Sequence, residues 1–206
     1  QLFLLALNTG MRCGELLGLC WDRVDFERRQ ILITRTRDRY ELKDTTKTGV
    51  NRAIPMNNIV YDTLLNMNQN KRHPSFVLTD AKGNSLNGSH ISERHLARAI
   101  KHAGVKKITF HNLRSTYASN FCMQGGDIFA LSKILGHTSV DMTAKKYAHL
   151  HPTYLREAAQ IIQFGNHETP DFSRHENPKF GTDDKAESAL KLLKVEREDG
   201  PILRLV

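Results

Sequence analysis

The sequence predicts a mixed α+β domain that is mainly α-helical and carries a small antiparallel β-sheet. Apolar residues recur at helical spacing in several segments bounded by capping residues and glycines. By contrast, residues 21–26 and 31–34 alternate around a polar turn, and residues 52–56 form a third short extended segment. A length of 206 residues makes one domain the first expectation.

The first part of the chain is expected to hold the strands. Residues 1–8 begin in a helix that Gly10 closes, and residues 11–20 form a second helix. The two alternating strands follow, and a second turn at 45–49 leads into the third strand. Pro55 suits an edge strand because proline cannot donate to the ladder.

The rest of the chain is expected to be helical, with one short extended piece at 76–78 and a turn at 82–84. Five helices are predicted from capping residues and glycine stops. They start at Asn57 or Asn58, at Ser89 (ending at Gly104), at Thr109 (ending near Gly125), at Asp127 (ending at Gly136) and at Ser139 (holding Tyr147). Pro152 marks the start of one more helix.

Composition and charge narrow the class of protein. No apolar run is long enough to cross a membrane, and the 3 cysteines are too scattered for a disulfide framework, which fits a reducing compartment. The net charge of +8 divides into +10 for residues 1–164 and −2 for residues 165–206. The excess of positive charge in residues 1–164 favours a polyanionic partner such as a nucleic acid. The alternative is a basic protein with no such partner.

The chain is expected to divide at about residue 164. Residues 1–164 form the predicted main domain, and residues 165–206 form a polar tail with a terminal helix near its end. We expect the chain to be a piece of a longer protein, because it begins within a helix. The apolar end at 201–206 is expected to pack on its own domain or on a neighbouring copy.

Five short stretches carry reactive side chains in a fixed order. They are TGMRCGEL at 9–16, TKTG at 46–49 with RAIP at 52–55, HNLRSTYAS at 111–119, LGH at 135–137 and YAH at 147–149. In this order they resemble the catalytic domain of the tyrosine recombinase (phage integrase) family. The resemblance spans residues 1–164 and implies that family's catalytic-domain fold.

Tyr147 is the candidate nucleophile. A phenol has a pKa near 10, so it needs help to lose its proton as it attacks phosphorus. The alternative is a tyrosine whose ring packs in the core, but Lys145 and Lys146 favour a helix that faces DNA. The resemblance implies a 3′-phosphotyrosyl bond at Tyr147. Tyr117 and Tyr154 are the next candidates.

Arg12 and Arg114 are the candidate phosphate clamp. A planar guanidinium meets two phosphate oxygens at once and stays protonated. The alternative for Arg12 is a surface ion pair with Glu15 three residues on. We expect Glu15 instead to support the site by holding Arg12 in place.

Two histidines complete the predicted set. His111 precedes Arg114 by three residues, so both share a helical face. His111 is expected to accept the Tyr147 proton or to donate to a phosphate oxygen. His137 follows a helix-ending glycine, where it can donate a hydrogen bond to the phosphate. No metal site is expected from these histidines, since no third ligand has suitable spacing.

Lys47 is a candidate catalytic residue because the resemblance implies a lysine on a β-hairpin that reaches the scissile phosphate. Its ammonium could protonate the departing 5′ oxygen. The alternative is an ordinary solvated turn lysine. Lys43 is the candidate if the register of the hairpin differs.

The resemblance implies a site-specific recombinase that cleaves and rejoins DNA without metal, ATP or another cofactor. Expected partners are double-stranded DNA, a homotetramer of the full-length protein on two DNA sites, and accessory DNA-bending proteins, with no membrane. The expected location is the cytoplasm, in association with the nucleoid. The expected source is a bacterium or a phage. The family's N-terminal core-binding domain is expected to be missing from this chain. The alternatives are a type IB topoisomerase-like relaxing enzyme and a non-catalytic DNA-binding module.

Overall fold

The computed structural model of the chain describes residues 1–38, 41–44, 51–86, 88, 91–151 and 159. Other sequence predictions fall outside these residues: the turn at 45–49 with Lys47, the cap at Ser89, the helix start at Pro152, the alternative nucleophile Tyr154 and the tail from 165.

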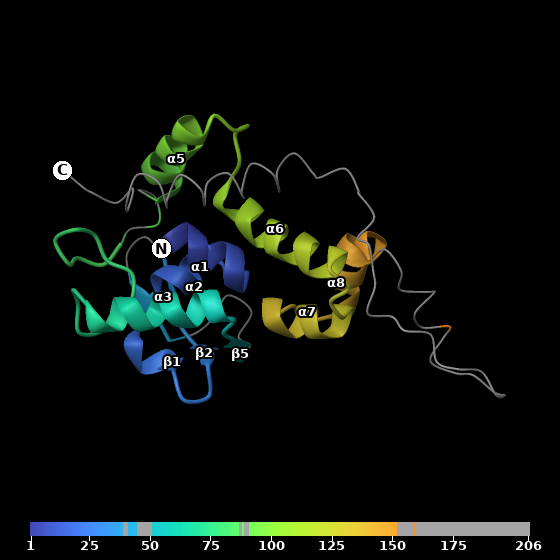
Figure 1. Cartoon of the computed structure of the whole chain (residues 1–206), viewed down its shortest axis with the longest axis horizontal. Helices are drawn as coiled ribbons and strands as arrows, with labels where there is room; N and C mark the ends of the chain where they lie inside the picture. Colours follow the sequence, from blue (N-terminus) through green and yellow to red (C-terminus); the bar gives the residue numbers. More distant parts are fainter. Residues whose placement is uncertain (39–40, 45–50, 87, 89–90, 152–158, 160–206) are drawn as a thin grey trace.

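Helices dominate the described part of the chain, as predicted (Figure 1). They are α1 (Leu2–Thr9), α2 (Cys13–Leu17), α3 (Asn58–Gln69), α5 (Leu96–Ala103), α6 (Phe110–Met123), α7 (Ile128–Leu135) and α8 (Val140–Tyr147). A π-helical turn (Ile91–His95) precedes α5, and 3-10 turns cover Trp21–Arg23 and Ala148–Leu150. Figure 1 shows α7 and α8 grouped beside the C-terminal half of α6, and α7 also contacts strand β5.

Among the described residues, the sheet has three antiparallel strands in the order β1 (Val24–Asp25), β2 (Gln30–Ile33), β5 (Arg52–Pro55). Ile31 pairs with Ile54 at its centre, and β5 is an edge strand, as Pro55 predicted. The first strand is shorter than predicted. Trp21 instead donates its backbone N–H to the Ser75 carbonyl at 2.8 Å, so a contact distant in sequence starts a 3-10 turn there.

A second hairpin, β3 (Thr36–Arg37) with β4 (Leu42–Lys43), was not predicted. It packs against α2, where a Cβ on Gly14 would lie 2.5 Å from the Thr36 hydroxyl oxygen. The predicted helix over 11–20 is also shorter, because Gly18 ends it and the Leu19 carbonyl accepts from Val77 N.

The predicted caps and stops are otherwise confirmed. Asn57, Asp127 and Ser139 each accept a backbone N–H of the helix that they begin, namely α3, α7 and α8. Gly10 and Gly136 end α1 and α7 in the left-handed conformation, with φ of 63° and 66°. These two stops fix the turns that precede Arg12 and His137.

The buried apolar residues form two clusters that α6 joins. The main cluster includes Phe110 and Leu113 from the first half of α6, together with residues of α1, α2, α3, α5 and the sheet. The smaller cluster contains Ala118, Cys122, Leu131, Leu135 and Tyr147. Arg114 therefore sits on α6 at the point where the chain passes from one cluster to the other.

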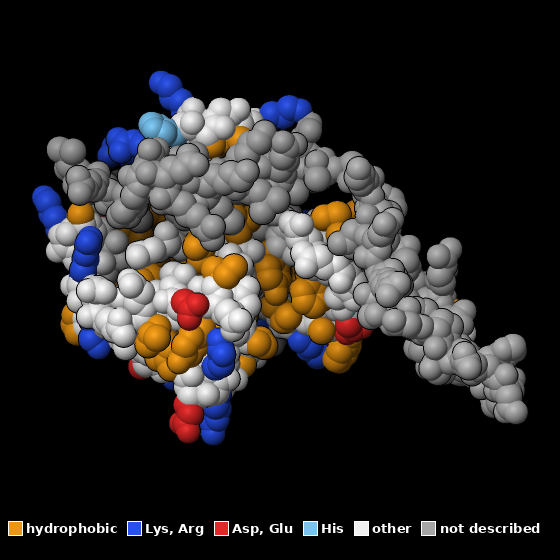
Figure 2. Space-filling model, in the orientation of Figure 1, with side chains coloured by type: hydrophobic (Ala, Val, Ile, Leu, Met, Phe, Trp, Pro, Cys, Tyr) orange, Lys and Arg blue, Asp and Glu red, His pale blue; other side chains and the backbone are white. Residues whose placement is uncertain are grey.

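Exposed basic side chains gather over α5 and the residues on either side of it, at the top of the face in Figure 2. They include Arg94, Arg98, Lys101 and Lys107.

A search of the described helices found none with the length and apolarity needed to span a bilayer.

Candidate active site

The N-terminus of α2 brings Arg12 against Glu15. The Arg12 backbone N–H donates to Glu15 Oε2 at 2.8 Å, and its Nη1 donates to Oε1 at 2.8 Å. The Glu15 side chain is 1% exposed, whereas the Arg12 side chain is 23% exposed. Glu15 therefore holds one edge of the guanidinium and leaves part of it accessible. This is the contact that the expected support role of Glu15 requires.

A further arginine, Arg52, shares Glu15, and the sequence assigned it no role. Its Nη1 and Nη2 donate to Glu15 Oε1 and Oε2 at 2.9 and 2.8 Å. Burial alone raises the pKa of Glu15, but the hydrogen bonds and charge of Arg52 and the hydrogen bonds from Arg12 lower it below its usual range. Glu15 thus stays ionised between two arginines. Only its place in the RAIP stretch pointed to Arg52.

Arg114 is buried between α1 and α7. Its Nη1 donates to the Gly10 carbonyl at 2.9 Å and its Nη2 to the Leu135 carbonyl at 2.6 Å. Burial lowers the pKa of Arg114 to about 10, with Arg12 acting in the same direction. The guanidinium still remains protonated at pH 7. It is held rigidly, next to the turns that carry Arg12 and His137.

His137 lies directly after the turn at the end of α7. Its Nδ1 lies 2.7 Å from the Thr143 hydroxyl oxygen on α8. Burial lowers the pKa of His137 to about 4, and the charges of Arg114, Arg12 and Lys146 act in the same direction. The ring is therefore neutral at pH 7. If Thr143 donates to Nδ1, the ring proton lies on Nε2, where a phosphate oxygen can accept it.

We expect the His137 imidazole of the free chain to titrate near pH 4 in an NMR titration of the ring resonances. Because the unfolded chain binds this proton near pH 6.5, stability is fully present above 6.5 and falls as the pH drops toward 4. His137→Gln should lose less thermal stability than the wild type over this window. A ring that titrates near 6.5 in the folded chain would contradict the prediction.

His111 and Arg114 share α6 but differ in burial. His111 is exposed in the first turn, whereas Arg114 is 4% exposed because two carbonyls draw it inward. His111 is therefore accessible to solvent one turn before Arg114 on the same helix. Within the described ranges, no group of three or more His, Cys, Asp or Glu side chains is arranged to hold a metal ion.

Tyr147 ends α8 and is 4% exposed, in the smaller core cluster. Its neighbours Lys145 and Lys146 are exposed, and the Lys146 ammonium lies 5.3 Å from the centre of the Tyr147 ring. The helix thus presents its lysines outward, as expected, while the ring itself packs inward. Helix α8 packs against both α6, which carries Arg114, and α7, which ends at the turn before His137.

Lys47 lies outside the described residues, so its expected position is untested. Lys43, its alternative, is described on β4. Its ammonium lies 2.8 Å from Asp38 and 3.7 Å from Glu41, and the hydrogen bond to Asp38 raises its pKa. Both contacts make Lys43 a weaker proton donor than a lysine without carboxylate neighbours.

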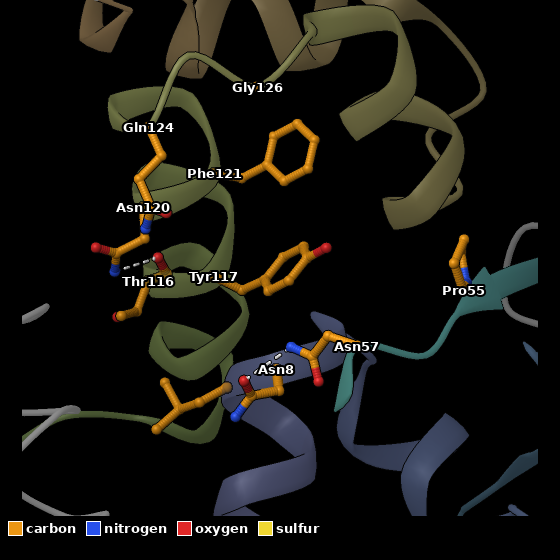
Figure 3. A pocket seen from close by; sticks show the side chains of 10 residues that line it. Asn8, Pro55, Asn57, Thr116, Tyr117, Asn120, Phe121, Gln124 and Gly126 are labelled. Carbon is orange, nitrogen blue, oxygen red and sulfur yellow. Dashed lines mark hydrogen bonds between the residues drawn. The ribbon is translucent and has the colours of Figure 1, made fainter. Parts of the chain in front are cut away.

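A cavity of about 560 Å³ lies between α6 and the residues around Asn8 and Asn57 (Figure 3). None of the predicted catalytic residues lines it. Tyr117 and Phe121 point into it from α6, and Asn8 and Asn57 close another side with a hydrogen bond of 3.2 Å. Burial raises the pKa of Tyr117, which makes it a poorer nucleophile. Its ring packs on Gly10, where a Cβ would lie 2.6 Å from Tyr117 Cδ1, and so helps to fix the carbonyl that Arg114 uses.

The sequence profile described as "Phage integrase family" matches residues 1–153. The chain belongs to the phage integrase family. This match confirms the resemblance stated from the sequence. The integrase of a Staphylococcus phage is 35% identical over 75% of this chain and 49% of its own length. The chain spans about half the length of the curated relatives that it matches first.

Solved structures confirm the fold class. The catalytic domain of bacteriophage HP1 integrase is 26% identical, with a TM-score of 0.53 over 77% of this chain and 79% of that one. The Tn1549 transposon integrase, solved in complex with a circular intermediate DNA, has a TM-score of 0.67 over 78% of this chain and 57% of that one. Because the sequence identity is 24%, the similarity to the Tn1549 integrase supports the fold alone.

Proposed function

We propose that this chain cleaves and rejoins DNA strands as the catalytic part of a site-specific recombinase. The observation that carries the proposal is the convergence of Arg12, Arg114 and His137 on the turns after α1 and α7, with Tyr147 on the next helix. Three cationic or hydrogen-bonding groups beside a phenol suit a phosphodiester in which charge develops on the non-bridging oxygens.

The proposed reaction exchanges one phosphoester bond for another. The Tyr147 oxygen bonds to phosphorus while the bond to the 5′ oxygen breaks. The phenol proton passes to His111, and Lys47 gives a proton to the 5′ oxygen as it leaves. Arg12, Arg114 and neutral His137 hold the two non-bridging oxygens. The 5′ hydroxyl of a partner strand then reverses these steps, so the bond energy is retained without ATP.

The proposed substrate is double-stranded DNA. The exposed basic residues around α5, at the top of the face in Figure 2, offer positive charge to phosphates. Lys145 and Lys146 on α8 are also exposed and add to this charge. We propose that the full-length protein forms a homotetramer on two DNA sites and that accessory DNA-bending proteins assist it. We further propose that it acts at the nucleoid of a bacterial cell. Residues 1–164 would form the catalytic domain, with 165–206 as a separate tail and the core-binding domain supplied by the rest of the protein.

The test uses a pool of labelled, nicked DNA duplexes with randomised sequence around the nick. Cleavage beside a nick releases a short fragment, so the covalent protein–DNA adduct cannot be reversed. We expect an adduct that survives denaturation and disappears on protease digestion. The sequence recovered most often then serves as the defined suicide duplex. A non-catalytic DNA-binding module gives no adduct, and relaxation of supercoils without strand exchange between two marked duplexes favours the topoisomerase alternative.

A further inference from the structure

Arg52 contacts two parts of the candidate site from a buried position. It is the first residue of β5 and pairs with Ile33 of β2, so the sheet fixes its backbone. Its side chain is 5% exposed. The head group reaches Glu15 on α2 and the Ile134 carbonyl on α7. All three nitrogens of the Arg52 guanidinium donate to protein oxygens, so this head group is suited to holding neighbouring groups in place.

The first contact controls Arg12 through Glu15. The Glu15 carboxylate accepts from the Arg12 backbone N–H, from Arg12 Nη1 and from both terminal nitrogens of Arg52. These bonds fill the acceptor capacity of a carboxylate. Without Arg52, a carboxylate that is 1% exposed would lose two charge-assisted bonds. Arg12, the remaining donor, would then turn toward it and away from the phosphate.

The second contact controls the turn before His137. Arg52 Nε donates to the Ile134 carbonyl at 2.7 Å, and Arg114 Nη2 donates to the next carbonyl, Leu135. Two cations thus cap the C-terminus of α7, where the helix dipole favours positive charge. A Cβ on Gly136 would lie 2.9 Å from Arg52 Cδ and Nη1, so the turn packs directly on Arg52.

We propose that Arg52 is a positioning residue for the phosphate-binding groups. It orients Arg12 through Glu15, and it fixes the turn that presents His137 through the Ile134 carbonyl. The proposal deepens the proposed DNA cleavage function and rests on it for its kinetic tests.

The kinetic test compares Arg52→Gln and Arg52→Lys on the suicide duplex. Arg28→Gln is the matched control, since the Arg28 side chain is 78% exposed in the turn between β1 and β2. We expect Arg52→Gln to slow adduct formation at saturating DNA by roughly 100-fold. The DNA concentration for half-maximal rate should stay within about twofold of the control, because Arg52 touches no phosphate. Arg52→Lys should recover part of the rate, since it keeps the charge but not the fork.

A double-substitution cycle tests whether Arg52 acts through Glu15. If it does, Glu15→Gln combined with Arg52→Gln should be no slower than the slower single variant. Independent action would instead multiply the two losses, and that result would overturn the Glu15 part of the proposal. A raised half-saturating DNA concentration with an unchanged maximal rate would overturn the positioning role, because it would mean direct DNA contact.

An NMR titration of His137 gives a readout that needs no activity. Burial lowers the His137 pKa most and the Arg52 charge adds to that effect, so Arg52→Gln should raise this pKa from about 4. If Arg52→Gln does not fold, the rate and the His137 titration of Arg52→Lys are compared with those of the wild type instead. A folded variant with wild-type rate and wild-type His137 titration overturns the proposal. If the wild type gives no adduct with any duplex, the proposed function fails, and the titration alone decides the role of Arg52.

Discussion

Tyr147→Phe should abolish the covalent protein–DNA adduct and leave DNA binding within about twofold of the wild type. The substitution removes one hydroxyl and keeps the ring, which is 4% exposed in the smaller core cluster. The packing of α8 should therefore survive, and the melting temperature should change little. The adduct is measured on the suicide duplex under denaturing conditions, and binding is measured by fluorescence anisotropy at fixed salt.

Tyr117→Phe is the matched control for this prediction. Tyr117 is half-buried on α6 and lines the neighbouring cavity, and it is a candidate nucleophile only if Tyr147 is not. We expect its adduct yield to equal that of the wild type. An adduct that persists in Tyr147→Phe and disappears in Tyr117→Phe would transfer the nucleophile to Tyr117. If both variants retain it, Tyr154 is the residue to replace next.

Local signals in the sequence correctly predicted the helix ends next to the candidate site. Gly10 and Gly136 were expected as helix stops, and both adopt the left-handed backbone that favours glycine. Asp127 and Ser139 were expected as caps, and each accepts the N–H that it should. Such positions depend on residues within one helical turn, so a single sequence contains the needed information.

Contacts between distant segments could not be predicted in the same way. Arg52 lies 37 residues from Glu15 and 82 from Ile134 along the chain, and no local pattern distinguishes it from a solvated arginine. The inward packing of Tyr147 has the same origin, since its ring meets side chains of α6 and α7. The short hairpin of β3 and β4 is set by its packing on Gly14 of α2 rather than by its own alternation.

Lys47→Ala should slow cleavage of ordinary DNA by about 100-fold or more, and a sulfur-containing substrate should largely restore the rate. If Lys47 is the general acid, its essential task is to protonate the 5′ oxygen as it leaves. Replacing that bridging oxygen with sulfur gives a thiolate leaving group, whose pKa is well below that of an alkoxide. Such a group departs without a proton. The measurement is the single-turnover rate of adduct formation on matched oxygen and sulfur duplexes.

Arg12→Ala provides the contrast that makes the restoration specific. Arg12 is proposed to act on the non-bridging oxygens, so changing the bridging atom should not rescue its loss. If Lys47→Ala stays slow on the sulfur duplex, its role is electrostatic or positional, and His111 becomes the better candidate acid. If Lys47→Ala is fully active on ordinary DNA, Lys43 is the next lysine to test. The bond of Lys43 to Asp38 at 2.8 Å raises its pKa, so it would first have to leave that carboxylate to act as the acid.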